Sequence, residues 1–127
     1  MSFTVVVFGP DDGSGPPQRL HEMSLGGQKT VLDYWAKPAL QLGFELLSQL
    51  SGENLAVRND QLSALSAELN TLAQQWIDIV PDDVTLSGTI GGRPFTVPLL
   101  VDLINRMNRL RDAIRIAELT GGHLQIW

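Results

Sequence analysis

The chain contains no cysteine, which excludes disulfide bonds, thiolate nucleophiles and zinc sites with cysteine ligands. It also lacks long hydrophobic runs, because no apolar stretch approaches the roughly 18 residues that a membrane-spanning helix needs. The first residues include no basic leader, and their apolar run is too short for a secretory signal peptide. We therefore expect no membrane association and, by default, a cytoplasmic location.

Charged residues make up only 18% of the chain and aromatic residues 6%, against 43% hydrophobic residues. This composition is typical of globular proteins, and a length of 127 residues predicts a single domain over residues 1–127. Nine basic against fourteen acidic residues give a formal net charge of -5. Because phosphate is repelled by such a surface, we do not expect nucleic acid as a partner.

The motifs of common catalytic and cofactor sites are missing as well. Gly26-Gly27-Gln28-Lys29-Thr30 has the lysine and hydroxyl of a phosphate-binding loop but not its glycine spacing. The two histidines, His21 and His123, do not form a pair at the spacing of a zinc-binding helix. We therefore predict no catalytic residue, no metal site and no cofactor.

Both ends of the chain have the hydrophobic pattern of short strands, at Phe3–Phe8 and His123–Trp127. We expect the first of these strands to lie centrally in a sheet, covered on both faces. Residues 9–29 are rich in glycine and proline near their start, which predicts a long loop that is either functional or mobile.

Three later segments have helical patterns. The longest spans Pro98–Leu119, with proline in the first turn and Gly121 placed to end the helix in a left-handed conformation. Another extends from Pro38 to Gly52, after a separate turn at Thr30–Ala36. The remaining helix begins at Asn59 or Asp60 as the cap and ends at Pro81.

Alternating apolar residues on either side of Gly91-Gly92, from Val84 to Val97, predict a β-hairpin. The elements then follow in the order β-α-α-β-β-α-β. Because the hairpin is antiparallel and the helices are clustered, we predict an α+β fold with three main helices on one face of a small, mainly antiparallel sheet. An all-α fold remains the alternative if the terminal strands are coil.

Four arginines of the last helix, Arg106, Arg109, Arg111 and Arg115, at first suggest a nucleic-acid interface. At 100° per residue, the first two lie about 160° from the last two, so that they do not form one basic track. We expect them to form ion pairs with acidic residues instead, or, for Arg111 and Arg115, to pack their stems over the edge of the core.

The helix before Pro81 has a narrow seam of leucines with spacings of three and four residues. The seam packs either inside the monomer or across a dimer axis. If it binds a partner, the contact residues are Leu62, Leu69 and Trp76, and Trp127 at the end of the last strand is a further candidate anchor.

Taken together, these features favour a small non-enzymatic protein that binds another protein, with homodimerisation as one form of this function. Immunity and antitoxin proteins offer an analogy in size and acidic charge only. The alternative is a small enzyme or ligand-binding domain with a pocket under residues 9–29. Its lining would comprise Asp11, Asp12, His21, Tyr34 and Trp35.

Overall fold

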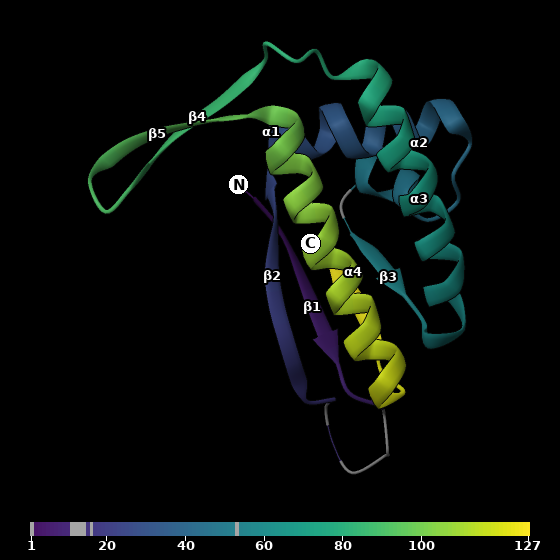
Figure 1. Cartoon of the computed structure of the whole chain (residues 1–127). Coiled ribbons are helices and arrows are strands. Elements are labelled where there is room, and N and C mark those ends of the chain that lie inside the picture. Colours follow the sequence, from purple (N-terminus) through teal and green to yellow (C-terminus); the bar gives the residue numbers. More distant parts are fainter. Residues whose placement is uncertain (1, 11–14, 16, 53) are drawn as a thin grey trace.

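Four antiparallel strands form the main sheet of the computed structural model, which describes residues 2–10, 15, 17–52 and 54–127 (Figure 1). The strands lie in the order β2-β1-β6-β3. Their bounds are Ser2–Phe8 for β1, Arg19–Gly27 for β2, Leu55–Val57 for β3 and His123–Ile126 for β6. The predicted strands at both ends of the chain are confirmed, and β1 lies in the interior of the sheet between β2 and β6.

In the described part of the chain, three helical units pack on one face of this sheet. Their bounds are Gln28–Val31 for α1, Leu32–Ala36 for a π-helical turn and Lys37–Leu42 for α2, followed by Leu62–Ile79 for α3 and Leu99–Thr120 for α4. Side chains alternate across a strand, so every second strand residue joins the helices in one hydrophobic cluster. These strand residues are Phe3, Val5, Val7, Met23, Leu25, Leu55, Val57, Leu124 and Ile126. The predicted α+β class is confirmed.

The predicted loop over residues 9–29 is wrong in its second half, where the chain forms the edge strand β2. Met23 lies opposite Val5 in the antiparallel register and is buried with it. Glu22 and Ser24, on either side of Met23, are exposed. An edge strand that buries only every second residue has low average hydrophobicity, and for this reason composition alone suggested a loop. The short strand β3 also adds to the predicted order.

The helix predicted from Pro38 to Gly52 is interrupted. α2 ends at Leu42, where Gly43 adopts a left-handed conformation with a φ of 73°. A short 3-10 helix, η2, then covers Leu47–Ser51. The prediction overlooked Gly43 because the leucines on both sides of it continue the apolar pattern, although glycine in this conformation ends a helix.

Pro38 does not start a new helix either, since α1, the π-helical turn and α2 follow one another without a break. Proline lacks an N–H, so Pro38 cannot donate to the carbonyl of Tyr34 four residues earlier. The indole N–H of Trp76 in α3 donates to that carbonyl at 2.6 Å. A π-helical turn, which widens the backbone, and this donor from another helix together accommodate the proline.

The start of η2 is held by a carboxylate from α3. Both oxygens of Glu68 accept backbone N–H groups, that of Leu46 at 3.2 Å and that of Leu47 at 2.9 Å. Helix N-termini have such N–H groups free, and a carboxylate is a strong acceptor for them. Glu68 therefore fixes the segment after Gly43 against α3.

We expect Glu68→Gln to destabilise the protein by about 1–2 kcal/mol, because one side of the amide donates and leaves an N–H of η2 without an acceptor. Urea denaturation of the full chain measures this. Glu45→Gln is the matched control, because Glu45 is exposed and its side chain is not part of these hydrogen bonds. Equal midpoints for the two variants would contradict the prediction.

The predicted N-cap of α3, Asn59 or Asp60, is wrong. A 3-10 turn at Asn59–Gln61 precedes the helix, and the side-chain oxygen of Gln61 accepts the N–H of Arg58 at 3.0 Å. Asn59 instead donates its amide to the carbonyl of Gly122 at 2.9 Å. This residue therefore connects the start of α3 to the start of β6 rather than closing a helix.

The C-terminal end of α4 follows the prediction. Gly121 has a φ of 69°, and its N–H donates to the carbonyl of Glu118 at 3.4 Å. The N–H of Gly122 donates to the carbonyl of Ala117 at 2.8 Å. This pair of bonds is a Schellman motif, which turns the chain directly into β6.

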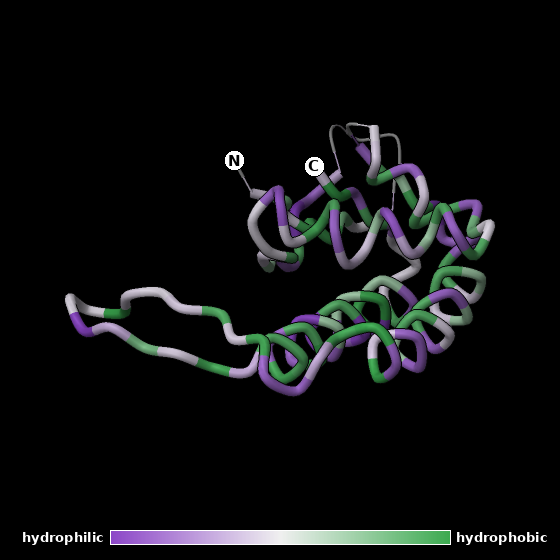
Figure 2. The backbone as a smooth tube through the Cα atoms, turned by 90° about the horizontal axis from the view of Figure 1, so that it is seen from above, coloured by the Kyte–Doolittle hydropathy of each residue, from purple (hydrophilic) through white to green (hydrophobic). Residues whose placement is uncertain are grey.

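The predicted hairpin is confirmed and forms a second, separate sheet of two strands, β4 at Thr85–Ile90 and β5 at Arg93–Pro98. It extends away from the rest of the molecule as an arm (Figures 1 and 2). We call these two strands and their turn the arm. Its root is fixed by the N–H of Leu99, which donates to the carbonyl of Val84 at 2.9 Å.

Candidate functional site

The arm has one apolar and one polar face. In its register, Leu86 lies opposite Val97, Gly88 opposite Phe95 and Ile90 opposite Arg93. Side chains alternate between faces, so these residues share one side, which we call the apolar face of the arm. The other side has threonine, serine and proline. Its residues are Thr85, Ser87, Thr89, Pro94, Thr96 and Pro98.

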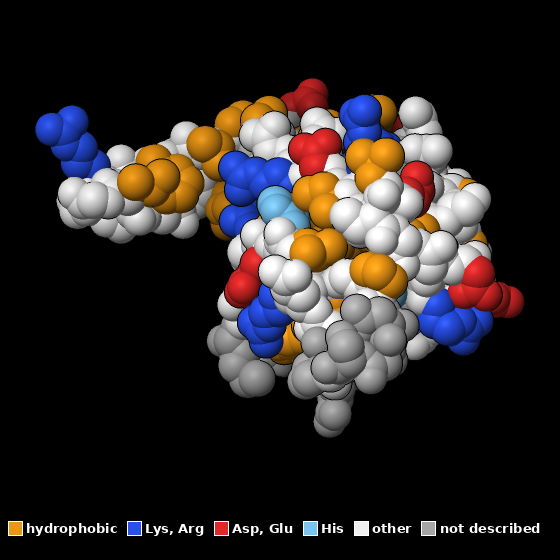
Figure 3. Space-filling view, turned by 90° about the horizontal axis from the view of Figure 1, so that it is seen from below, with side chains coloured by type: hydrophobic (Ala, Val, Ile, Leu, Met, Phe, Trp, Pro, Cys, Tyr) orange, Lys and Arg blue, Asp and Glu red, His pale blue; other side chains and the backbone are white. Residues whose placement is uncertain are grey.

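The outer part of the apolar face is left uncovered by the residues that the structure describes, whereas Leu86 near the root packs against the hydrophobic core. Ile90 near the tip is 70% exposed, and Leu86, Phe95 and Val97 are only partly buried. Seen from below, hydrophobic side chains follow the arm toward the body of the molecule (Figure 3). The centre of this face is flat, because the Phe95 ring lies over Gly88, where an added Cβ would be 2.6 Å from a ring carbon.

Charged residues are found only at the root of the arm and at its tip. Asp82 and Asp83 are the central residues of a turn in which the N–H of Val84 donates to the carbonyl of Pro81 at 3.2 Å. Arg93 follows the glycine turn at the tip. All three of these charged residues are exposed. The apolar face therefore lies between an acidic root and a basic tip.

Further exposed apolar residues lie on the helices beside the root. α3 runs toward the arm and α4 runs away from it (Figure 1), and Arg111 of α4 donates to Asn70 of α3 at 3.1 Å. About two helical turns nearer the arm, Ile77 and Ile104 therefore lie on the same side of this helix pair. They are 59% and 36% exposed, and Ile79 and Val101 nearer the root are 39% and 49% exposed.

The leucine seam of α3 is not part of this surface. Leu62, Leu69 and Trp76 are at most 1% exposed and belong to the hydrophobic core of their own chain. Their assignment as partner-contact residues is wrong, because side chains that fill the monomer core cannot reach a partner. The seam packs against the other helices and the sheet.

Trp127 lies on the face of the sheet opposite the helices and is 38% exposed. Its ring centroid is 6.2 Å from that of Phe8. The Arg19 guanidinium lies 6.0 Å from the Phe8 ring centroid and 5.9 Å from the Trp127 ring centroid. Val6 is two residues from Phe8 on the same face and only 1% exposed. β1 is therefore buried on both faces, as predicted, since Val5 and Val7 pack in the core on the other face. A partner role for Trp127 stays a prediction.

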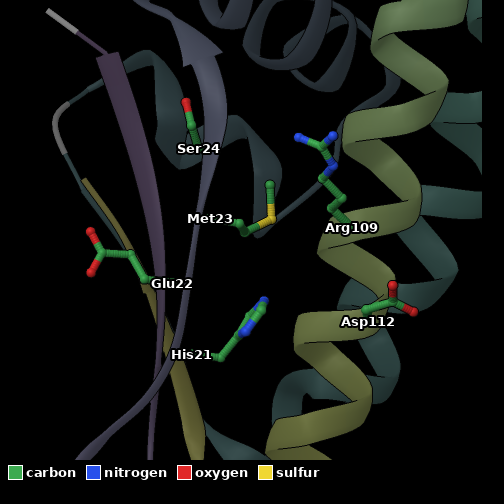
Figure 4. A pocket seen from close by; sticks show the side chains of 6 residues that line it. All are labelled: His21, Glu22, Met23, Ser24, Arg109 and Asp112. Atoms are coloured by element: carbon green, nitrogen blue, oxygen red, sulfur yellow. The ribbon is translucent and has the colours of Figure 1, made fainter.

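A hollow of about 330 Å³ opens between β2 and α4. His21 and Met23 point from the strand toward α4, whereas Glu22 points away from it (Figure 4). Arg109 and Asp112 contribute from α4. Because the Glu22 side chain points away, the side chains that face the hollow include one guanidinium and one carboxylate, so its charge does not select a ligand of either sign.

The other residues of the predicted pocket are not brought to this hollow. Asp11 and Asp12 lie outside the described residues. Trp35 is completely buried, with its ring 4.9 Å from that of Trp76, and Tyr34 packs against the same core. Only His21 of the predicted lining borders the hollow, so the structure does not assemble that pocket from the residues it describes.

The two histidines lie on opposite faces of the sheet. His21 pairs with Val7, which points toward the helices, whereas His123 stacks on Phe8 at 5.4 Å on the other face. They cannot bind one metal ion together. Within residues 2–10, 15, 17–52 and 54–127, no group of three or more His, Asp and Glu side chains is placed to hold a metal.

The arginines of α4 contact different neighbours, but of the four only Arg106 forms the predicted ion pair among the described residues. Arg106 forms an ion pair with Asp102 at 3.0 Å and donates to the carbonyl of Ser24 at 3.1 Å. Arg111 donates to Asn108 and Asn70 instead of a carboxylate. These contacts fix α4 to β2 and α3, and they do not form a continuous basic track.

No protein-family model matches this chain, and neither a curated protein nor a solved structure shows detectable similarity to it. The described helices include none with the length and apolar character required to cross a membrane. The arm and the surface around its root remain the feature of the molecule that its own packing does not explain.

Proposed function

We propose that this chain is a non-enzymatic protein that binds another protein through the apolar face of the arm. The observation that supports this proposal is the arm itself, which extends from the body with Ile90 at 70% exposure and three further apolar side chains only partly buried. Exposed apolar surface of this kind is typical of a protein contact site.

The stability of the arm supports the same function. An isolated two-stranded hairpin is only marginally stable in water, because it has no second layer against which to bury its side chains. Here Leu86 packs against the core at the root and the ring of Phe95 lies on Gly88, but toward the tip Ile90 is 70% exposed. A partner that covered the apolar face would supply the missing layer and order the arm.

The ligand-binding alternative has less support. The hollow between β2 and α4 is open and of mixed charge, and it gathers only His21 from the predicted pocket residues. The arm, with an apolar face and a polar reverse side, fits a protein contact better than this hollow fits a ligand site.

Serine substitutions on the two faces of the arm test the proposal. The variant Ile90→Ser with Phe95→Ser changes the apolar face, and the control Thr89→Ser with Thr96→Ser introduces the same residue type on the polar face. Each immobilised chain is offered a purified second copy and an extract of the producing cells. We expect the first variant to bind at least tenfold less protein than the unmodified chain, and the control to bind the same amount.

Circular dichroism checks that both variants keep the fold of the body. Loss of bound protein in the control as well as in the apolar variant would assign the effect to general damage. If the apolar variant bound everything that the unmodified chain binds, the proposed function would be wrong.

A further inference from the structure

Resting on the proposed function, we infer that the partner of the arm is a second copy of this chain, with the two arms antiparallel and their apolar faces in contact about a two-fold axis. Most homodimers have such an axis, and it requires a surface that is complementary to itself. The arm meets this requirement in its charges, its side-chain spacing and its surroundings.

The charges favour an antiparallel arrangement. Between residues 81 and 98 the only charged residues are Asp82 and Asp83 at the root and Arg93 at the tip. When two arms lie antiparallel, each basic tip meets the acidic root of the other copy. When they lie parallel, arginine meets arginine and aspartate meets aspartate, which is repulsive. The antiparallel orientation is therefore attractive at both ends of the paired arms.

The spacing of the side chains is also symmetric. The Gly88 and Phe95 pair lies midway between the Leu86 and Val97 pair and the Ile90 and Arg93 pair. An axis through this middle pair places Ile90 of each copy on Leu86 of the other. Because Phe95 lies flat on Gly88, two Phe95 rings can meet beside the axis without a protruding side chain between them.

The reach of the tip agrees with this register. Leu86 and Ile90 are four residues apart, or about 14 Å along a strand. Arg93 is paired with Ile90, so it would lie over Val97 of the second copy, the residue paired with Leu86, and its long side chain extends toward the acidic root there. The ion pairs would thus flank the apolar contact as a polar rim.

The area required also indicates contacts beyond the arm. Two strands of six residues offer a face about 20 Å long and 10 Å wide, well below the roughly 800 Å² that a stable interface buries on each partner. Ile79 and Val101 beside the root are 39% and 49% exposed. In the antiparallel pairing each tip reaches the root of the other copy, which brings the tip near these two residues.

Sedimentation velocity of the full chain over a concentration series tests whether it dimerises, and charge reversal tests the register. We expect Arg93→Asp to raise the dimer dissociation constant about tenfold at low salt, because attraction becomes repulsion at two symmetric places. Combining it with Asp82→Lys and Asp83→Lys should restore most of the affinity. Arg115→Asp on the exposed side of α4 is the control and should leave the dimer unchanged.

The absence of cysteine allows a direct test of which residues meet. We expect a mixture of Leu86→Cys and Ile90→Cys chains to form a disulfide-linked dimer under mild oxidation. Either variant alone should give much less of it. Cross-linking of each variant with itself, and little in the mixture, would show parallel arms and overturn the inference.

The outcomes separate the inference from the proposed function. A dimer that persists in the variant Ile90→Ser with Phe95→Ser would show that the copies associate elsewhere, and the inference would be wrong. A chain that stays monomeric, but loses a different bound protein in that variant, overturns the inference and leaves the proposed function standing. A monomer whose bound proteins do not depend on the arm overturns both.

Discussion

Replacing Gly122 with alanine is expected to destabilise the protein by about 3 kcal/mol or more, one of the two largest effects that the structure predicts. A Cβ at this position would collide with the carbonyl oxygen of Phe8 in the neighbouring strand. Both atoms belong to rigid backbone, so neither can move aside as the end of a side chain would. The midpoint of thermal unfolding should fall by about 10 °C.

Gly121→Ala is the matched control, because the two glycines are adjacent and differ in what surrounds them. Gly121 has open space around an added Cβ but a φ of 69°. Its substitution should cost only about 1 kcal/mol, the penalty of a left-handed conformation for alanine. A smaller loss of stability for Gly122→Ala than for Gly121→Ala would contradict this account of the junction between α4 and β6.

The elements that the sequence predicts well are those whose local signals agree with their tertiary contacts. α4 has a proline before its first residue, an apolar stripe and a glycine where the Schellman motif needs one. β1 is an interior strand and therefore apolar on both faces. The arm has alternating residues around a glycine turn. In each case the signal lies within the segment itself.

The elements that the sequence hides depend on contacts from distant segments. β2 is recognised as a strand only through its pairing with β1, since its outward residues are polar. The carboxylate of Glu68 and the indole of Trp76 supply hydrogen bonds to backbone more than twenty residues away. Periodicity within one segment contains no information about such partners.

The candidate site was missed for a related reason. The hairpin pattern from Val84 to Val97 predicts one apolar face, but it does not say whether the rest of the chain covers that face. By contrast, the more strongly apolar seam of α3 looked like the contact surface and proved to be core, with Trp76 completely buried. Surface and core seams have the same spacing, so only the packing of the whole chain distinguishes them.

Trp76→Phe is expected to destabilise the protein by about 2–4 kcal/mol, the other large effect. The substitution shrinks a completely buried side chain and removes the indole N–H that donates to the Tyr34 carbonyl at 2.6 Å. Because Pro38 has no N–H, the normal helical donor for this carbonyl is missing as well. A buried carbonyl without a donor costs about 1–3 kcal/mol.

Trp35→Phe separates the hydrogen bond from the loss of volume. Trp35 is equally buried and packs edge to face against Trp76, but its own indole N–H has no hydrogen-bond partner among the residues that the structure describes. Trp35→Phe therefore removes similar packing but leaves the Tyr34 carbonyl with its donor from Trp76. It also removes the unpaired N–H of Trp35. In urea denaturation of the full chain, Trp76→Phe should be the less stable variant by about 1–3 kcal/mol. Equal stability would mean that the donation from Trp76 does not help the helix accommodate Pro38.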